Sequence, residues 1–95
     1  MEGLTLASVV RIAPRVVSAT VAGEVVILDP DAAKYFGVEG SAVEIWEMLR
    51  EPRRVGDVRD RLLELYEVDA AECEADVLAI LEKMRGGGLI EVVER

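Results

Sequence analysis

The alternation of hydrophobic and polar positions predicts strands in the first part of the chain. From Arg15 onward, β-branched residues alternate between two faces, which is the period of a strand, and Ala22-Gly23-Glu24 supplies a turn. A second strand is expected at Val25–Leu28, followed by the turn signal Asp29-Pro30-Asp31. A short third strand follows at residues 33–38, and its Gly37 favours a position at the edge of the sheet.

The period then changes to that of helices. A first helix is expected from Ser41 to about Glu51-Pro52, because Ser41 and Glu44 match a capping box. A second runs from about Val55 to Glu67. A third begins at Asp69, where the capping pattern recurs, and stops at Gly86-Gly87-Gly88. Residues 89–93 are expected to form a closing strand.

These elements predict an α+β fold close to a winged helix-turn-helix, with a three-stranded antiparallel sheet packed on three helices. The 95 residues suffice for one hydrophobic core. Residues 1–14 show no clear period and are expected to be a tail or loose segment. The domain is therefore expected to span residues 15–95.

Charge narrows the choice of partner. Eleven basic against nineteen acidic residues give a net charge of −8, which argues against a nucleic-acid partner and favours a basic peptide or protein surface. No apolar run approaches the roughly 20 residues that span a bilayer. The first residues also lack the basic start of a secretion signal, so we expect a cytoplasmic protein without a membrane partner.

Catalysis is not expected. The chain has no histidine, the commonest general base and metal ligand, and Cys73 is its only cysteine. Acidic pairs such as Asp29/Asp31 and Glu72/Asp76 are explained by solvated turns and helix faces. We therefore expect no enzyme activity, no metal and no cofactor.

Binding of an extended peptide is the physical hypothesis that remains. An edge strand offers unpaired backbone groups to an added strand, and the third helix would form the wall of a groove beside it. Lys34, Tyr35 and Phe36 would form the pairing edge. The spacing along the third helix leaves open which side chains face the groove and which face the core. The candidates are Cys73, Val77, Ile80 and Met84 in the groove, with Asp69 and Asp76 at its rim.

The ordered set of motifs resembles the PqqD-like family of recognition elements for ribosomally made, modified peptides. The matching pieces cover roughly residues 15–93. They are Asp29-Pro30, Tyr35-Phe36, Val38 to Trp46, Val55 to Val58, Tyr66, Asp76-Val77 and Gly88-Leu89.

This resemblance implies a non-catalytic protein that binds the leader of a precursor peptide by strand addition to the third strand, against the third helix. The chain is most similar to the stand-alone subunit of lasso-peptide biosynthesis. That similarity implies three partners: a basic leader with a Tyr-x-x-Pro motif, a separate cysteine protease and a macrolactam cyclase. A PqqD-like chaperone for another modifying enzyme, such as a radical enzyme, has the same signature.

A winged-helix transcription factor is the other alternative. It requires a basic helix, and arginines do cluster between residues 50 and 61. They are interleaved with acidic residues, however, which is typical of a solvated face.

Overall fold

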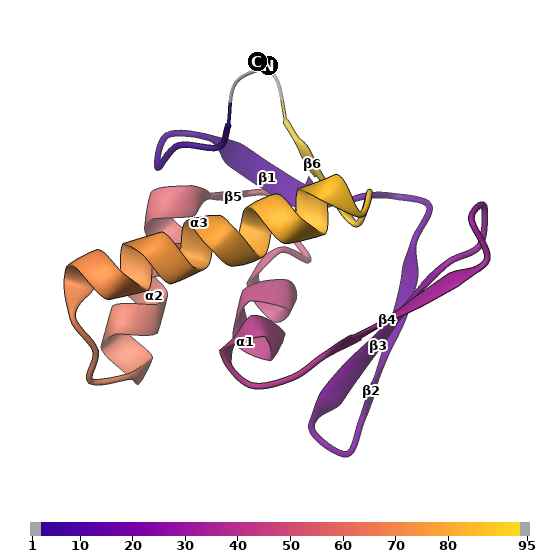
Figure 1. The fold of residues 1–95 in the computed structure, drawn as a ribbon, viewed down its shortest axis with the longest axis horizontal. Helices are drawn as coiled ribbons and strands as arrows, with labels where there is room; N and C mark the ends of the chain where they lie inside the picture. The colour runs from indigo at the N-terminus through magenta and orange to yellow at the C-terminus, as the bar shows by residue number, and fades with distance from the viewer. Residues whose placement is uncertain (1–2, 94–95) are drawn as a thin grey trace.

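The computed structural model describes residues 3–93 and confirms the α+β class (Figure 1). Within these described residues, three helices and six short strands follow each other in an order that mixes the two kinds of element. The strands form two three-stranded antiparallel sheets, where the sequence predicted a single sheet. In chain order the elements are β1 Val9–Ile12, β2 Val17–Val21, β3 Glu24–Asp29, β4 Lys34–Val38, α1 Ser41–Met48, β5 Arg53–Arg54, α2 Val55–Leu65, α3 Ala70–Gly86 and β6 Ile90–Val92.

The first sheet has the order β2-β3-β4 and is built from two consecutive hairpins. Ala22 and Gly23 both have positive φ, at 52° and 83°, as the two-residue turn between β2 and β3 requires. The second turn is held by Asp29, whose buried carboxylate accepts hydrogen bonds from the amides of Asp31 (3.1 Å) and Ala32 (3.3 Å). These local turns fix the register of all three strands.

That register determines which backbone groups of β4 are unpaired. The two-residue turn makes Val21 and Glu24 a hydrogen-bonded pair, so alternation turns the backbone groups of Val25 and Ile27 toward β4. Val25 lies opposite Val38 and Ile27 opposite Phe36. The intervening residues of β4, Tyr35 and Gly37, therefore direct their N–H and C=O groups away from β3, to the open edge of the sheet.

The second sheet, β5-β1-β6, corrects the expectation of a loose N-terminal segment. β1 pairs with β6 over Val10↔Val92 and Ile12↔Ile90, and with β5 over Val9↔Arg54. Val10 is 0% exposed. A four-residue strand is too short to show a period, and its partner lies about 80 residues away, so its sequence alone gave no signal.

The helix starts differ from the expected capping in one of two places. Asp69 caps α3 as predicted, its carboxylate accepting a hydrogen bond from the Glu72 amide at 3.1 Å. The capping box at Ser41 was wrong, because Ser41 is already the first helical residue. The cap position is Gly40, at φ 65°, and no side chain caps α1. Within residues 3–93, no helix is long and apolar enough to cross a membrane.

The core lies where the three helices meet both sheets. Trp46 of α1 is completely buried and donates from its indole Nε1 to the Ser18 hydroxyl on β2, at 3.1 Å. Figure 1 shows α3 lying across the molecule above α1 and α2, with its C-terminal end near β6. α3 thus lies beside the strands of both sheets.

We expect Val10→Ala to lower the free energy of unfolding by about 2 kcal/mol, because it removes two buried methyl groups and leaves a cavity. Val17→Ala is the matched control, since Val17 is 56% exposed on β2 and should cost less than about 0.5 kcal/mol. Urea denaturation followed by Trp46 fluorescence measures both. Equal effects of the two substitutions would show that β1 is not part of the core.

Candidate functional site

A groove lies between the open edge of β4 and α3. Its first part, the strand-side hollow, has a volume of about 310 Å³. β4 and the residues that follow it form one wall, and the C-terminal half of α3 forms the other. The lining residues are Phe36, Gly37, Val38, Glu39, Ala42, Ile80, Lys83, Met84 and Leu89.

The second part, the helix-side hollow, continues the groove along the N-terminal half of α3. It has a volume of about 270 Å³, and Ile80 lines both hollows. The end of α2 and the segment after it close its far side. The lining residues are Ser41, Leu62, Tyr66, Val68, Glu72, Cys73, Asp76, Val77 and Ile80.

The structure brings most of the candidate residues to this groove. Six of the nine line one of the hollows: Phe36, Cys73, Asp76, Val77, Ile80 and Met84. Lys34, Tyr35 and Asp69 do not line it. Tyr35 is 74% exposed on the opposite face of the sheet, while Phe36 is half-buried on the groove side. Only one of these adjacent aromatic residues therefore enters the interior, as strand geometry requires.

α3 divides its side chains between the core and the groove. Cys73, Val77 and Met84 are buried and form the floor, whereas Ile80 is half-buried and projects from the wall. Val77 is only 1% exposed. A charged substitution at Val77 would therefore unfold the protein as well as alter the groove, and Ile80 is the position that can be changed selectively.

Several lining residues were missed by the sequence analysis. Tyr66 and Val68 follow the end of α2, and both are exposed apolar residues that the sequence places in a connecting segment. Two apolar residues close together in an exposed connection were the available signal. The chain segment around Glu39 gave no such signal, because its position depends on how β4 leads into α1.

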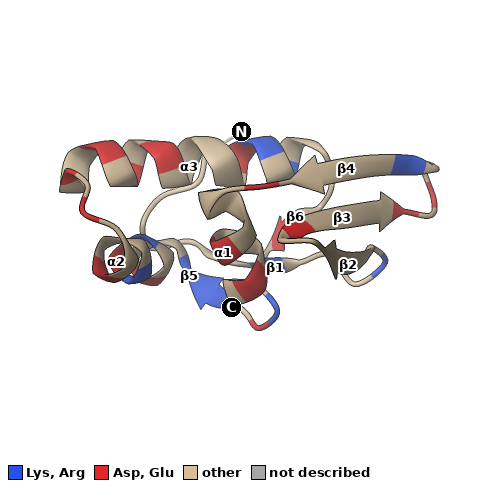
Figure 2. Ribbon diagram, turned by 90° about the horizontal axis from the view of Figure 1, so that it is seen from below, with Lys and Arg blue, Asp and Glu red and all other residues tan. Residues whose placement is uncertain are grey.

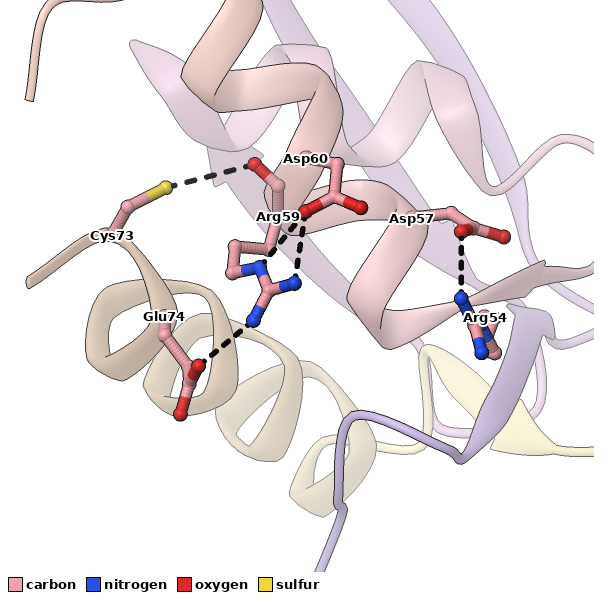
Figure 3. A network of polar contacts seen from close by, with 6 residues as sticks. All are labelled: Arg54, Asp57, Arg59, Asp60, Cys73 and Glu74. Atoms are coloured by element: carbon pink, nitrogen blue, oxygen red, sulfur yellow. Dashed lines mark hydrogen bonds and ion pairs between the residues drawn. The ribbon is translucent and has the colours of Figure 1, made fainter. Parts of the chain in front are cut away.

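Cys73 is held in a reduced, unreactive environment. Its Sγ lies 3.9 Å from the backbone oxygen of Arg59 on α2, as drawn in Figure 3. Burial is the main cause that raises the pKa of the thiol; the nearby Asp76 carboxylate adds to it and the Arg59 guanidinium opposes it. A protonated thiol is a poor nucleophile and a poor metal ligand. Within residues 3–93, no three metal-ligating side chains come together.

The arginines between residues 50 and 61 all form ion pairs with acidic side chains. Arg59 contacts Asp60 and Glu74, both at 2.9 Å, and Arg54 contacts Asp57 at 3.2 Å (Figure 3). The rest of the cluster is paired as well: Arg50 with Glu47, Arg53 with Glu51 and Arg61 with Glu64. Neutralised arginines do not form the basic face that a DNA-binding helix needs. This arrangement disfavours the transcription-factor alternative.

At neutral pH we expect iodoacetamide to alkylate Cys73 at least about tenfold more slowly in the folded protein than in denaturing urea, because the thiol is buried and protonated. The raised pKa also has a consequence for stability. The stabilisation that comes from keeping the buried thiol protonated is complete at pH values below the ordinary thiol pKa of about 8.5. It is lost as the pH rises through the higher pKa of the thiol in the folded state. Cys73→Ala should lack that alkaline loss. Equal alkylation rates in both states would contradict the buried placement.

The fold has known counterparts among solved structures. TbiB1 in complex with the TbiA(beta) leader peptide shares 30% identity and a TM-score of 0.82 over 90% of this chain and 99% of that one. A lasso peptide synthetase B1 complexed with the leader peptide shares 24% identity and a TM-score of 0.78 over 86% and 96% of the two chains. The PqqD truncation of Methylobacterium extorquens PqqCD, a stand-alone recognition element, shares 22% identity and a TM-score of 0.77 over 94% and 95%.

No curated protein sequence matches the chain. The family described as coenzyme PQQ synthesis protein D does match, over residues 24–90, which is most of the chain and spans every element from β3 to the start of β6. The chain therefore belongs to the PqqD family.

Proposed function

We propose that this protein is a non-catalytic recognition element that binds the leader segment of a ribosomally made precursor peptide. The leader would add as a strand to the open edge of β4 and lie against α3. In this role the protein delivers the precursor of a lasso peptide to a separate leader peptidase and to a cyclase. A PqqD-like chaperone serving another modifying enzyme would use the same groove and differ in the leader it selects.

The observation that carries this proposal is an unpaired strand edge bordering an apolar groove. Tyr35 and Gly37 direct free backbone groups outward, and an added strand would satisfy them. Alternate side chains of that strand would point into the groove, where Phe36, Ile80 and Met84 offer apolar contact. Backbone pairing would supply affinity, and the hollows would supply selectivity.

Similarity to TbiB1 supports the same assignment, because that protein is 30% identical, matches over nearly its whole length and is seen with a leader peptide. The acidic residues Glu72 and Asp76 in the helix-side hollow favour a leader with a basic residue at that end. The preference for a basic residue agrees with the net charge of −8.

Fluorescence polarisation tests the proposal directly. The probes are the labelled TbiA(beta) leader peptide and a labelled lysine-rich leader with a Tyr-x-x-Pro motif, each with a scrambled control. We expect sub-micromolar binding of at least one leader and none of its scrambled form. If neither leader binds better than its scrambled control, the lasso-leader assignment is wrong.

Gly37→Pro should weaken leader binding about tenfold, or ~1.4 kcal/mol, because it removes the outward N–H at the centre of the β4 edge. An added Cβ at Gly37 meets nothing within 4 Å, and a thermal melt of the free variant checks that the rest of the proline ring is accommodated. Thr20→Pro is the control, since the same alternation turns the N–H of Thr20 to the opposite edge, on β2. Equal losses from the two prolines would exclude strand addition at β4.

Ile80→Glu should abolish leader binding while the circular-dichroism spectrum stays native, because Ile80 is only half-buried and lines both hollows. Val77→Glu should instead lose the native spectrum, since it places a charge in the core. The same polarisation titration and a thermal melt separate the two results. A folded Ile80→Glu variant with unchanged affinity would place the leader elsewhere on the surface.

A further inference from the structure

The basic residues of this acidic protein are not equally available to a ligand. Within residues 3–93, every arginine has an acidic partner within 4 Å: Arg11, Arg15, Arg50, Arg53, Arg54, Arg59, Arg61 and Arg85. Among the same described residues, neither Lys34 nor Lys83 forms an ion pair. These lysines are thus the positive charges that the described part of the chain leaves unneutralised.

The sequence explains why Lys83 has no partner on its own helix. Positions three and four residues away are occupied by Ala79 and Ile80 on one side and by Gly86 and Gly87 on the other. The neighbouring Glu82 is paired with Arg85 at 3.3 Å and also accepts a hydrogen bond from the Leu4 amide at 3.0 Å. No carboxylate on α3 is therefore placed to neutralise Lys83.

Lys83 lies where a bound strand would pass. It lines the strand-side hollow together with Phe36 and Met84. Glu39 also lines this hollow, but within residues 3–93 it forms no ion pair with Lys83. In Figure 2 acidic bands mark the N-terminal half of α3, whereas acidic and basic bands lie side by side toward its C-terminal end. A peptide covering this hollow would exclude water from an unpaired ammonium group, which is costly without a counter-charge.

We propose that Lys83 binds a carboxylate of the peptide, so that an Asp or Glu at one fixed position is a determinant of which leader is accepted. This inference rests on the proposed function and adds a specificity residue to it. A neutral peptide would leave the ammonium partly desolvated and unpaired, and a peptide with Lys or Arg at that position would be repelled. Lys83 would thereby fix the register of the added strand.

The order of charges in the ligand follows from the geometry. β4 runs from the strand-side hollow toward Ser41, which lines the helix-side hollow. A strand added antiparallel to β4, like the other pairs in this sheet, would run in the opposite direction. Its N-terminal part would lie near Glu72 and Asp76, and its C-terminal part near Lys83. The preferred ligand therefore carries a basic residue first and the acidic residue after it.

Selection from a phage-displayed random peptide library tests this directly. We expect wild-type protein to enrich peptides with Asp or Glu at a fixed distance on the C-terminal side of an apolar anchor. Lys83→Glu should enrich Lys or Arg at the same position instead. Arg61→Glu is the control: it reverses an exposed basic residue of α2 that lines neither hollow and lies off the β4 edge, and it should leave the enriched pattern unchanged.

The outcomes distinguish the two proposals. If wild-type protein enriches no peptide at all, the proposed function fails and this inference fails with it. If it enriches peptides without an acidic position, or if Lys83→Glu selects the same peptides, the inference is overturned while peptide recognition stands. For a selected peptide we expect Lys83→Met to weaken binding about three- to fivefold. Changing the peptide's acid to Lys should restore affinity for Lys83→Glu.

Discussion

The burial of one face of α3 is the constraint on which the rest of the structure depends. Cys73, Val77, Leu81 and Met84 recur every three or four residues and are all buried, so the helix is fixed both in position and in rotation. Each such side chain contributes about 1.5–3 kcal/mol when removed from water. Once this stripe is fixed, the adjoining stripe of Asp76, Ile80 and Lys83 faces the groove beside β4.

Local signals in the sequence predicted the elements that local interactions determine. The alternation from Val17 to Leu28 and the turn around Gly23 gave β2 and β3, because a two-residue turn fixes its own register. Asp69 was recognised as a cap since its bond spans only three residues. Ser41 was misassigned because the glycine before it adopts a positive φ, and a backbone angle leaves little trace in the side chains that follow.

The sequence predicted which elements form the site, but not which of their side chains line it. The β4 edge and α3 follow from the strand, the helix and the family resemblance, but two adjoining stripes on one helix cannot be separated by spacing alone. Val77 and Ile80 are three residues apart, and only packing against the sheets decides that the first is floor and the second wall. Likewise, the role of Lys83 depends on which acids are already paired, and pairing is a property of the folded chain.

The strand that the sequence analysis missed sets the order in which the protein can assemble. The β2-β3-β4 sheet uses contacts between near neighbours, so it can form early, whereas the other sheet joins residues 9–12 to residues 90–92. The register of β4 is therefore set by contacts closer in sequence than those that place β1. The second sheet can close only after residues 90–92 have been made, so the pairing of β1 with β6 comes late in the order of assembly.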